Sequence, residues 1–344
     1  MNTAQCPASV EELELHLSEP TPRVIEVLQQ FDGDVMLLGA GGKMGPTMAR
    51  MARRAMDAGG IKRRVIAVSR FRTAAARERL EQAGVETITC DLFDRADLER
   101  LPDAPLVMSM SGFKFGASSN PELAWATNCY LPALIGERFA KSRVVAFSSG
   151  NVYGMVPVSS GGSVETDPLR PDGEYSMTAV GRERMYVYAS NRWQFPLALL
   201  RLNYATELRY GVLVDLAQQV VAANPIDVTM GYVNVLWLRD ANAMSLAAFA
   251  HAACPHVVMN VAGSEILRLR DVCRRMGEHI GKRVEFAGVE ADQALLNNGT
   301  AAYAKLGTPE MRVDTMIRWT AQWVARGGEL LGKPTHFQVR NGRF

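Results

Sequence analysis

The sequence has few cysteines and no metal-binding spacing. Its five cysteines are an odd number, lie far apart and include no C-x-x-C pair, so we expect neither a disulfide framework nor a cysteine zinc site. The five histidines include no H-x-x-x-H pair. We therefore predict free thiols in a reducing compartment and no bound metal.

A long apolar segment and an excess of one charge are also missing. No apolar run approaches the ~20 residues that span a bilayer, and the first residues, with Glu11, Glu12 and Glu14, lack the apolar segment of a signal peptide. The net charge is only +2 and the basic residues are scattered, which argues against a nucleic-acid surface. We expect a cytoplasmic protein that acts on a small molecule and contacts neither membrane nor nucleic acid.

The most informative feature that is present is a glycine-rich turn. Apolar residues 35–38 lead into Gly39, Gly42 and Gly45, spaced G-x-x-G-x-x-G, and a helical pattern follows over 46–58. Glycine permits tight dihedrals and close approach of a ligand, and the first N–H groups of a helix attract phosphates. Ordinary strand–helix junctions also contain glycine, but the strand and the helix on either side favour a dinucleotide site, with Lys43 and Met44 among its contacts.

Strands and helices alternate after this turn. The apolar runs 35–38, 65–68, 87–90, 106–110, 144–147 and 197–202 are separated by helical stretches such as 73–83 and 122–140. This alternation predicts an α/β, Rossmann-type doubly wound parallel sheet, with ligands at the carboxyl ends of the strands. We expect a helical extension (1–33), a dinucleotide-binding Rossmann domain (34–202) and a smaller C-terminal α/β substrate lobe with a tail (203–344).

Residues 147–154 read F-S-S-G-N-V-Y-G, and Tyr175 follows in E-Y-S-M-T-A. With the glycine motif, this order resembles the extended short-chain dehydrogenase/reductases, the NAD-dependent epimerase/dehydratase family that includes UDP-galactose 4-epimerase, over residues 35–282. The resemblance implies that Ser149 hydrogen-bonds the substrate oxygen at the reacting carbon. It also implies that Tyr175 removes the alcohol proton during hydride transfer.

Cofactor choice is predicted from the end of the second strand. An NAD enzyme usually has a carboxylate there, whereas this chain has Ser69 and Arg70, which suit a 2′-phosphate. NADP is therefore favoured over NAD, the alternative being that Arg70 is a solvated charge at a helix start. Asp91 and Leu92 stand where the family contacts adenine; as an alternative or additional role, Asp91 caps the helix 94–101.

The cation beside the tyrosine departs from the family pattern. The resemblance places Met110, Ser111 and Lys114 at the cofactor, with Asn128 beside that loop, but the family lysine that follows the tyrosine is Ala179 here. Three interpretations stay open: Lys114 (or Arg182) supplies the charge, the tyrosine works slowly with the cofactor charge alone, or the protein binds NADP without catalysis.

Two further departures concern the substrate. Gly150 and Asn151 replace the Asp-Glu pair of the family dehydratases, and residues 230–235 (M-G-Y-V-N-V) lack the arginine that grips the nucleotide diphosphate. Asn151, Asn203 and Arg209 join Ser149 as substrate contacts, although Arg209 also suits a structural ion pair.

We expect an NAD(P)-dependent oxidoreductase or epimerase that transfers hydride on a hydroxyl-bearing sugar, sugar acid or nucleotide sugar. The alternative is a non-catalytic NADP-binding regulator or sensor. The family's assembly implies a homodimer formed through the helices near 122–140 and 175–191.

Overall fold

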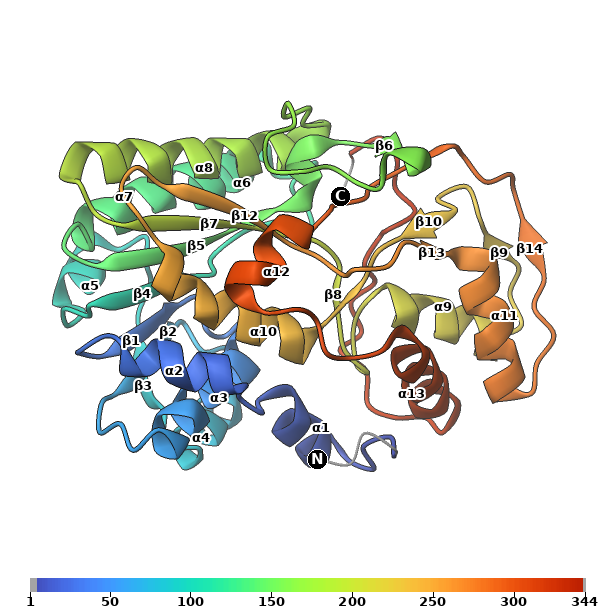
Figure 1. Cartoon of the computed structure of the whole chain (residues 1–344), viewed down its shortest axis with the longest axis horizontal. Coiled ribbons are helices and arrows are strands. Elements are labelled where there is room, and N and C mark those ends of the chain that lie inside the picture. Colours follow the sequence, from blue (N-terminus) through green and yellow to red (C-terminus); the bar gives the residue numbers. More distant parts are fainter. Residues whose placement is uncertain (1–4, 343–344) are drawn as a thin grey trace.

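The computed structural model describes residues 5–342. Among them, seven parallel strands form one sheet in the order β3-β2-β1-β4-β5-β7-β12 (Figure 1). Their bounds are β1 (Val35–Leu38), β2 (Val65–Ser69), β3 (Glu86–Thr89), β4 (Leu106–Ser109), β5 (Arg143–Ser149), β7 (Leu197–Leu202) and β12 (Val257–Val261). The predicted parallel Rossmann-type sheet is confirmed.

Helices cover both faces of this sheet. One face carries α2 (Pro22–Gln29), α3 (Gly45–Ala58), α4 (Ala74–Gln82), α10 (Leu238–Ala247) and α12 (Thr300–Leu306), and the other α5 (Arg95–Arg100), α7 (Leu131–Arg138) and α8 (Gly173–Trp193). Along β1, Val35 and Leu37 join one core while Met36 and Leu38 join the other. Because both faces are buried, the strands read as continuous apolar runs.

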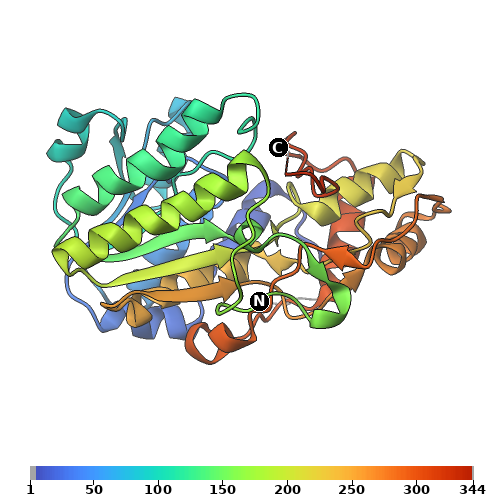
Figure 2. The same cartoon turned by 90° about the horizontal axis from the view of Figure 1, so that it is seen from above.

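A second core lies beyond the carboxyl ends of the strands (Figures 1 and 2). It is built by α9 (Val212–Val221), α11 (Leu269–Ile280), α13 (Val313–Ala325) and by Leu13 and Leu17 of α1 (Val10–Leu17). Short ladders complete it: β8 (Ala205–Thr206) with β11 (Leu236–Trp237), β6 (Val156–Pro157) with β15 (Gln293–Ala294), β9 (Ile226–Asp227) with β14 (Phe286–Ala287) and β10 (Tyr232–Val233) with β13 (Leu267–Arg268).

The chain does not stay in the second lobe after residue 202. It returns to the sheet with α10 and β12, so the lobe boundary is crossed more than once. The N-terminal helices are likewise shared, since α1 packs in the second core and α2 against the sheet. The division at residues 33 and 202 stays a prediction.

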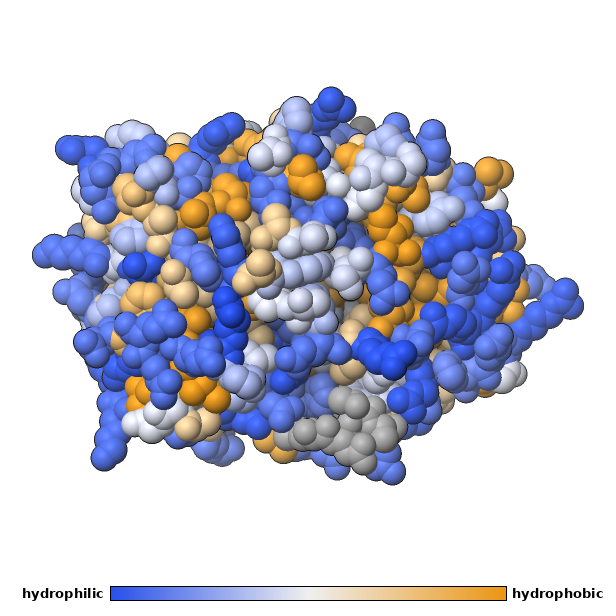
Figure 3. Space-filling view, viewed as in Figure 1, coloured by the Kyte–Doolittle hydropathy of each residue, from blue (hydrophilic) through white to orange (hydrophobic). Residues whose placement is uncertain are grey.

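The surface shows no apolar belt on the face drawn in Figure 3, where hydrophilic residues dominate and hydrophobic ones form separate patches. Within residues 5–342, no helix combines the length and apolar character needed to cross a membrane.

A buried ion pair joins α8 to β7. The Arg201 Nε and Nη2 atoms donate to the two carboxylate oxygens of Glu183 at 2.9 and 2.8 Å, and Ser148 Oγ donates to the same carboxylate at 2.6 Å. Arg201 Nη1 also donates to the Tyr153 hydroxyl (2.7 Å), which donates to Asn260 Oδ1 (2.8 Å). This network fixes α8 against three neighbouring strands, β5, β7 and β12.

We predict that Glu183→Gln destabilises the fold strongly, because it leaves the Arg201 charge buried without its counter-ion. Breaking a buried pair costs roughly 3–5 kcal/mol, measurable as a lower free energy of unfolding in urea. Arg184→Met, at an exposed position of the same helix, is the control and should change stability by no more than about 0.5 kcal/mol. Equal losses in the two variants would contradict a stabilising network.

Candidate active site

The three motif glycines are needed for different physical reasons. Gly39 has φ +83°, and a Cβ there would lie 2.7 Å from Ser111 Oγ. A Cβ on Gly45 would lie 2.1 Å from the carbonyl oxygen of Ala40, so α3 can pack on the turn only with glycine there. For Gly42 the nearest atom to an added Cβ is Gly39 O at 3.5 Å, which leaves that side of the turn open to a ligand.

The helix that follows presents free backbone donors. Its N-cap residue, Met44, makes no side-chain capping hydrogen bond, and Pro46 occupies the first turn. The turn lies after β1, between β4 and β2, at the carboxyl edge where the strand order reverses. Uncapped N–H groups and a helix dipole at that edge can hold a pyrophosphate.

The predicted adenosine contacts follow β2 and β3. Ser69 ends β2 so close to the turn that a Cβ on Gly41 would lie 2.5 Å from its hydroxyl, and Arg70 beside it is exposed. Asp91 Oδ1 accepts from Phe93 N (3.1 Å), and Leu92 is buried in the sheet core. The cap of α5 is Asp94, which accepts from two N–H groups, so the helix-cap interpretation of Asp91 is wrong.

A buried amide holds the loop that follows β4. Asn128 Oδ1 accepts from Phe113 N (2.9 Å), and its Nδ2 donates to Phe113 O (2.8 Å) and Thr178 Oγ1 (2.9 Å). Upstream, Met110 N donates to Leu38 O (2.9 Å), and Ser111 lies against Gly39. Asn128 is fully buried, so it positions the loop that carries Lys114.

Lys114 and Tyr175 come together at this edge. The Lys114 Nζ lies 5.4 Å from the centroid of the Tyr175 ring, and burial lowers the pKa of Lys114 to about 8. Tyr175 is buried near the start of α8 with Ala117 and Ala124. Ser149 ends the neighbouring strand β5, where its hydroxyl accepts from Asn151 N (3.2 Å) and donates to Asn151 Oδ1 (3.0 Å).

Lys114 and Arg182 are the two cations that could replace the family lysine, whose position is occupied by Ala179. Ala179 is fully buried with Val152 and Tyr153. Arg182 lies under the β4 loop, where it donates to Phe147 O (3.2 Å) and to Asn128 Oδ1. The cation whose distance to the tyrosine ring is short is therefore Lys114.

Two of the predicted substrate-binding side chains, Asn203 and Arg209, are bonded to other residues of the protein. Asn203 Nδ2 donates to Asn234 Oδ1 (2.9 Å), and Arg209 pairs with Glu207 (3.0 Å) and Glu14 (3.2 Å). These interactions favour structural roles for Asn203 and Arg209. Their assignment as substrate contacts stays a prediction.

Sequence reasoning missed two features of this region. Asn297 is buried so close to Gly150 that a Cβ on that glycine would lie 2.3 Å from Asn297 Oδ1, and neither polar side-chain atom of Asn297 has a hydrogen-bond partner among the described residues. The Lys43 ammonium lies 3.4 Å from the centroid of the Tyr210 ring. Neither contact has a local sequence signal, because the partners are over a hundred positions apart.

Comparisons with known proteins agree with this geometry. The sequence model of the NAD dependent epimerase/dehydratase family matches residues 35–205. The fold is similar to UDP-glucose 4-epimerase of Thermus thermophilus in complex with NAD (TM-score 0.70, 19% identity, covering 86% of this chain and 99% of that one). It is also similar to UDP-glucuronic acid 4-epimerase of Bacillus cereus in complex with NAD (TM-score 0.70, 15% identity, covering 85% and 96%).

No curated protein matches the sequence significantly. At these identities the similarity to solved structures establishes the fold. The family match covers the glycine turn, the loop after β4 that carries Lys114, the strand that ends at Ser149 and the helix that carries Tyr175. The predicted resemblance to this family is confirmed.

We predict that two alanine substitutions in the glycine turn change different properties, one the stability of the fold and the other the affinity for NADP⁺. Gly45→Ala forces a methyl group onto the Ala40 carbonyl and should lower stability by roughly 1–3 kcal/mol. The methyl group of Gly42→Ala meets open space, so the free energy of unfolding should change by no more than about 0.5 kcal/mol. Its affinity for NADP⁺ should fall about tenfold or more, which corresponds to ~1.4 kcal/mol of binding free energy. Urea unfolding and calorimetric titration measure both quantities. Unchanged NADP⁺ affinity in Gly42→Ala would mean that the turn does not bind the pyrophosphate.

Proposed function

We propose that this protein is an NAD(P)-dependent oxidoreductase or epimerase that transfers hydride on a hydroxyl-bearing, sugar-like substrate. The observation that carries the proposal is the Lys114 ammonium beside the Tyr175 ring, at the edge of the sheet that bears the glycine turn. The match of residues 35–205 to the epimerase/dehydratase family supports it.

The residues around the turn fit a dinucleotide. The open side of Gly42 and the uncapped start of α3 would hold its pyrophosphate, and Ser69 with Arg70 would meet the adenosine ribose. When bound, the nicotinamide ring accepts a hydride or gives one back. The two UDP-sugar epimerases compared above were solved with NAD, which supports a nicotinamide cofactor of the same class.

The chain's own residues would then manage the proton. The Tyr175 hydroxyl takes the proton of the substrate alcohol, and the Ser149 hydroxyl hydrogen-bonds the same oxygen. A neutral tyrosine is a weak base at pH 7, so the positive charge of Lys114 stabilises the tyrosinate in place of the lysine that Ala179 lacks. A dehydrogenase would accumulate NADPH, whereas an epimerase would convert substrate without it.

The replacement of the lysine by Ala179 also favours a second candidate, a non-catalytic NADP-binding regulator. In that case NADP⁺ would bind tightly while no sugar or sugar acid is turned over.

We expect a cytoplasmic enzyme that prefers NADP. Arg70→Asp should weaken NADP⁺ binding roughly ten- to a hundredfold while NAD⁺ affinity changes little, because one charge-assisted phosphate contact worth about 1.5–3 kcal/mol is lost. Arg72→Asp, an equally exposed position two residues on, is the control. If titration shows that the wild type prefers NAD⁺, the assignment of Arg70 is wrong.

Tyr175→Phe removes the hydroxyl alone and should lower turnover about 10²–10⁴-fold with NADP⁺ affinity unchanged. Tyr188→Phe, exposed on the same helix, should keep full turnover. Lys114→Ala should also slow turnover and move the ascending limb of the pH–rate profile to higher pH, since the tyrosinate loses its cation. Full activity of Tyr175→Phe on a true substrate would exclude this mechanism.

The proposed assembly is a homodimer. Large apolar side chains are exposed on two adjacent segments, the helix α6 (Pro121–Trp125) with its continuation and α8: Leu123 (44%), Trp125 (46%), Tyr130 (50%), Met177 (38%) and Tyr188 (61%). Figure 2 shows these helices running side by side, and Figure 1 places them at one edge of the molecule. Such a patch suits a two-fold interface between copies of the chain.

Tyr188→Glu would place a charge in that interface and should give a monomer by light scattering at micromolar concentration. Val289→Glu, at a position 82% exposed in the second lobe, should remain dimeric. A monomeric wild type would end the expectation of a dimer.

A further inference from the structure

The side chain of Lys43 leaves the glycine turn and reaches the second lobe. Its Nζ lies 3.4 Å from the centroid of the Tyr210 ring and 4.5 Å from that of Phe115. Tyr210 stands two residues before α9. The backbone of Lys43 therefore belongs to the predicted cofactor turn, while its ammonium lies between two aromatic rings that face the substrate lobe.

The C-terminal tail, residues 331–342, runs past the same place. Thr335 donates to Asp215 Oδ2 of α9 from both its N–H (2.8 Å) and its hydroxyl (2.5 Å), and the His336 ring lies 5.8 Å from the Phe115 ring. Further on, Gly342 packs so tightly on Gly173 that a Cβ on Gly173 would lie 2.2 Å from its carbonyl oxygen. The tail thus spans from α9 to the first turn of the helix that carries Tyr175.

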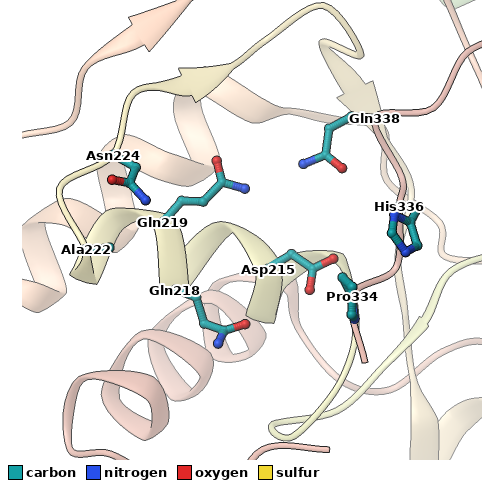
Figure 4. Close-up of a pocket in the computed structure, with 8 residues that line it drawn as sticks. All are labelled: Asp215, Gln218, Gln219, Ala222, Asn224, Pro334, His336 and Gln338. Carbon is teal, nitrogen blue, oxygen red and sulfur yellow. The ribbon is translucent and has the colours of Figure 1, made fainter. Parts of the chain in front are cut away.

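A polar pocket of about 420 Å³ opens between α9 and this tail. Asp215 and His336 line it, and Figure 4 shows Gln219 of the helix and Gln338 of the tail facing each other across it. The tail therefore forms one wall of this hollow. His336, which lines it, has its ring 5.8 Å from the ring of Phe115, one of the two rings around the Lys43 ammonium.

Positive charge around Lys43 exceeds negative charge. Burial, together with the nearby ammonium groups of Lys333 and Lys114, lowers the pKa of Lys43 to about 7. Within residues 5–342, the direct contacts of the Lys43 ammonium are with the Phe115 and Tyr210 rings, and it forms no ion pair. The neighbouring carboxylate, Asp215, already accepts two hydrogen bonds from Thr335. A bound anion would relieve this repulsion.

We propose that Lys43 and Lys333, with His336, bind the anionic group of the substrate, a carboxylate or a phosphate, in a site that the C-terminal tail completes. The Phe115 and Tyr210 rings form its apolar walls. This site takes the place of the arginine that is missing from residues 230–235. The inference rests on the proposed function for the position of the reacting hydroxyl.

The same geometry shows how far apart the anion site and the proton-transfer site lie. Lys114, beside Tyr175, also has its Nζ 5.6 Å from the centroid of Phe115. One aromatic side chain therefore separates the anion site from the proton-transfer site. A sugar acid or sugar phosphate carries an anionic group and a hydroxyl at such a separation, and a long nucleotide tail is not needed to reach Lys43.

The test is calorimetric titration of the full chain, saturated with NADP⁺, with D-glucuronate, inorganic phosphate and neutral glucose. We expect D-glucuronate or phosphate to bind, the better of the two identifying the carboxylate or the phosphate, and glucose to bind at least tenfold more weakly. Lys43→Met should weaken anion binding about tenfold or more, the effect of one lost charge-assisted hydrogen bond, and Lys43→Arg should retain it. Lys62→Met, at an exposed position, is the matched control.

Two results would overturn the site. One is that neither anion binds the wild type more tightly than glucose. The other is that Lys43→Met lowers the affinity for NADP⁺ and leaves the affinity for the anion unchanged, which would assign Lys43 to the cofactor site. Should Lys43→Met unfold, Lys333→Met, on the exposed tail, tests the same contact without disturbing the core. Because inorganic phosphate has no alcohol to oxidise, its binding is measured without turnover, and loss of hydride transfer with intact phosphate binding would refute the proposed function alone.

Discussion

The buried side-chain amide of Asn128 is the contact on which the candidate site depends. A buried amide must satisfy its donors and acceptors, and Asn128 does so with the backbone of Phe113, the hydroxyl of Thr178 and the guanidinium of Arg182. One side chain thus ties the loop after β4 to the helix that bears Tyr175. Lys114 and Phe115 follow Phe113 directly, so their positions relative to the tyrosine are set by that amide.

The helix around Asn128 shows where the sequence could not predict the fold. The stretch 122–140 predicts one helix, but the structure has α6, a π-helical turn over Ala126–Tyr130 and then α7. A π-turn widens the helix and is frequent at functional sites. No pattern in the sequence predicts it. The strands could be predicted because most of their residues are apolar and buried on both faces. The observed strand ends differ from the predicted ones by no more than two residues.

The candidate site likewise has residues that the sequence could predict and contacts that it could not. Gly39, Gly42, Gly45, Ser149 and Tyr175 stand in short motifs whose meaning is local, so they could be named from the sequence. For Arg209 the choice between a substrate contact and a structural ion pair could not be made from the sequence, because one of its partners, Glu14, lies 195 positions earlier. The pairing of Lys43 with Tyr210 and of Asp215 with Thr335 likewise depends on how the second lobe and the tail meet the sheet. Such contacts follow from packing and have no periodic signal.

The surroundings of Ala179 show why a lysine would fit poorly at this position of the helix. This residue is fully buried with Val152 and Tyr153, and the Tyr153 hydroxyl accepts from Arg201 in the network with Glu183. The α8 face that bears the lysine in the family is therefore used here for close packing beside a buried ion pair. An extra ammonium there would incur a desolvation cost and add a like charge near Arg201. In the proposed function, a lysine in the β4 loop, which Asn128 holds in place, would supply charge to the tyrosine without that conflict.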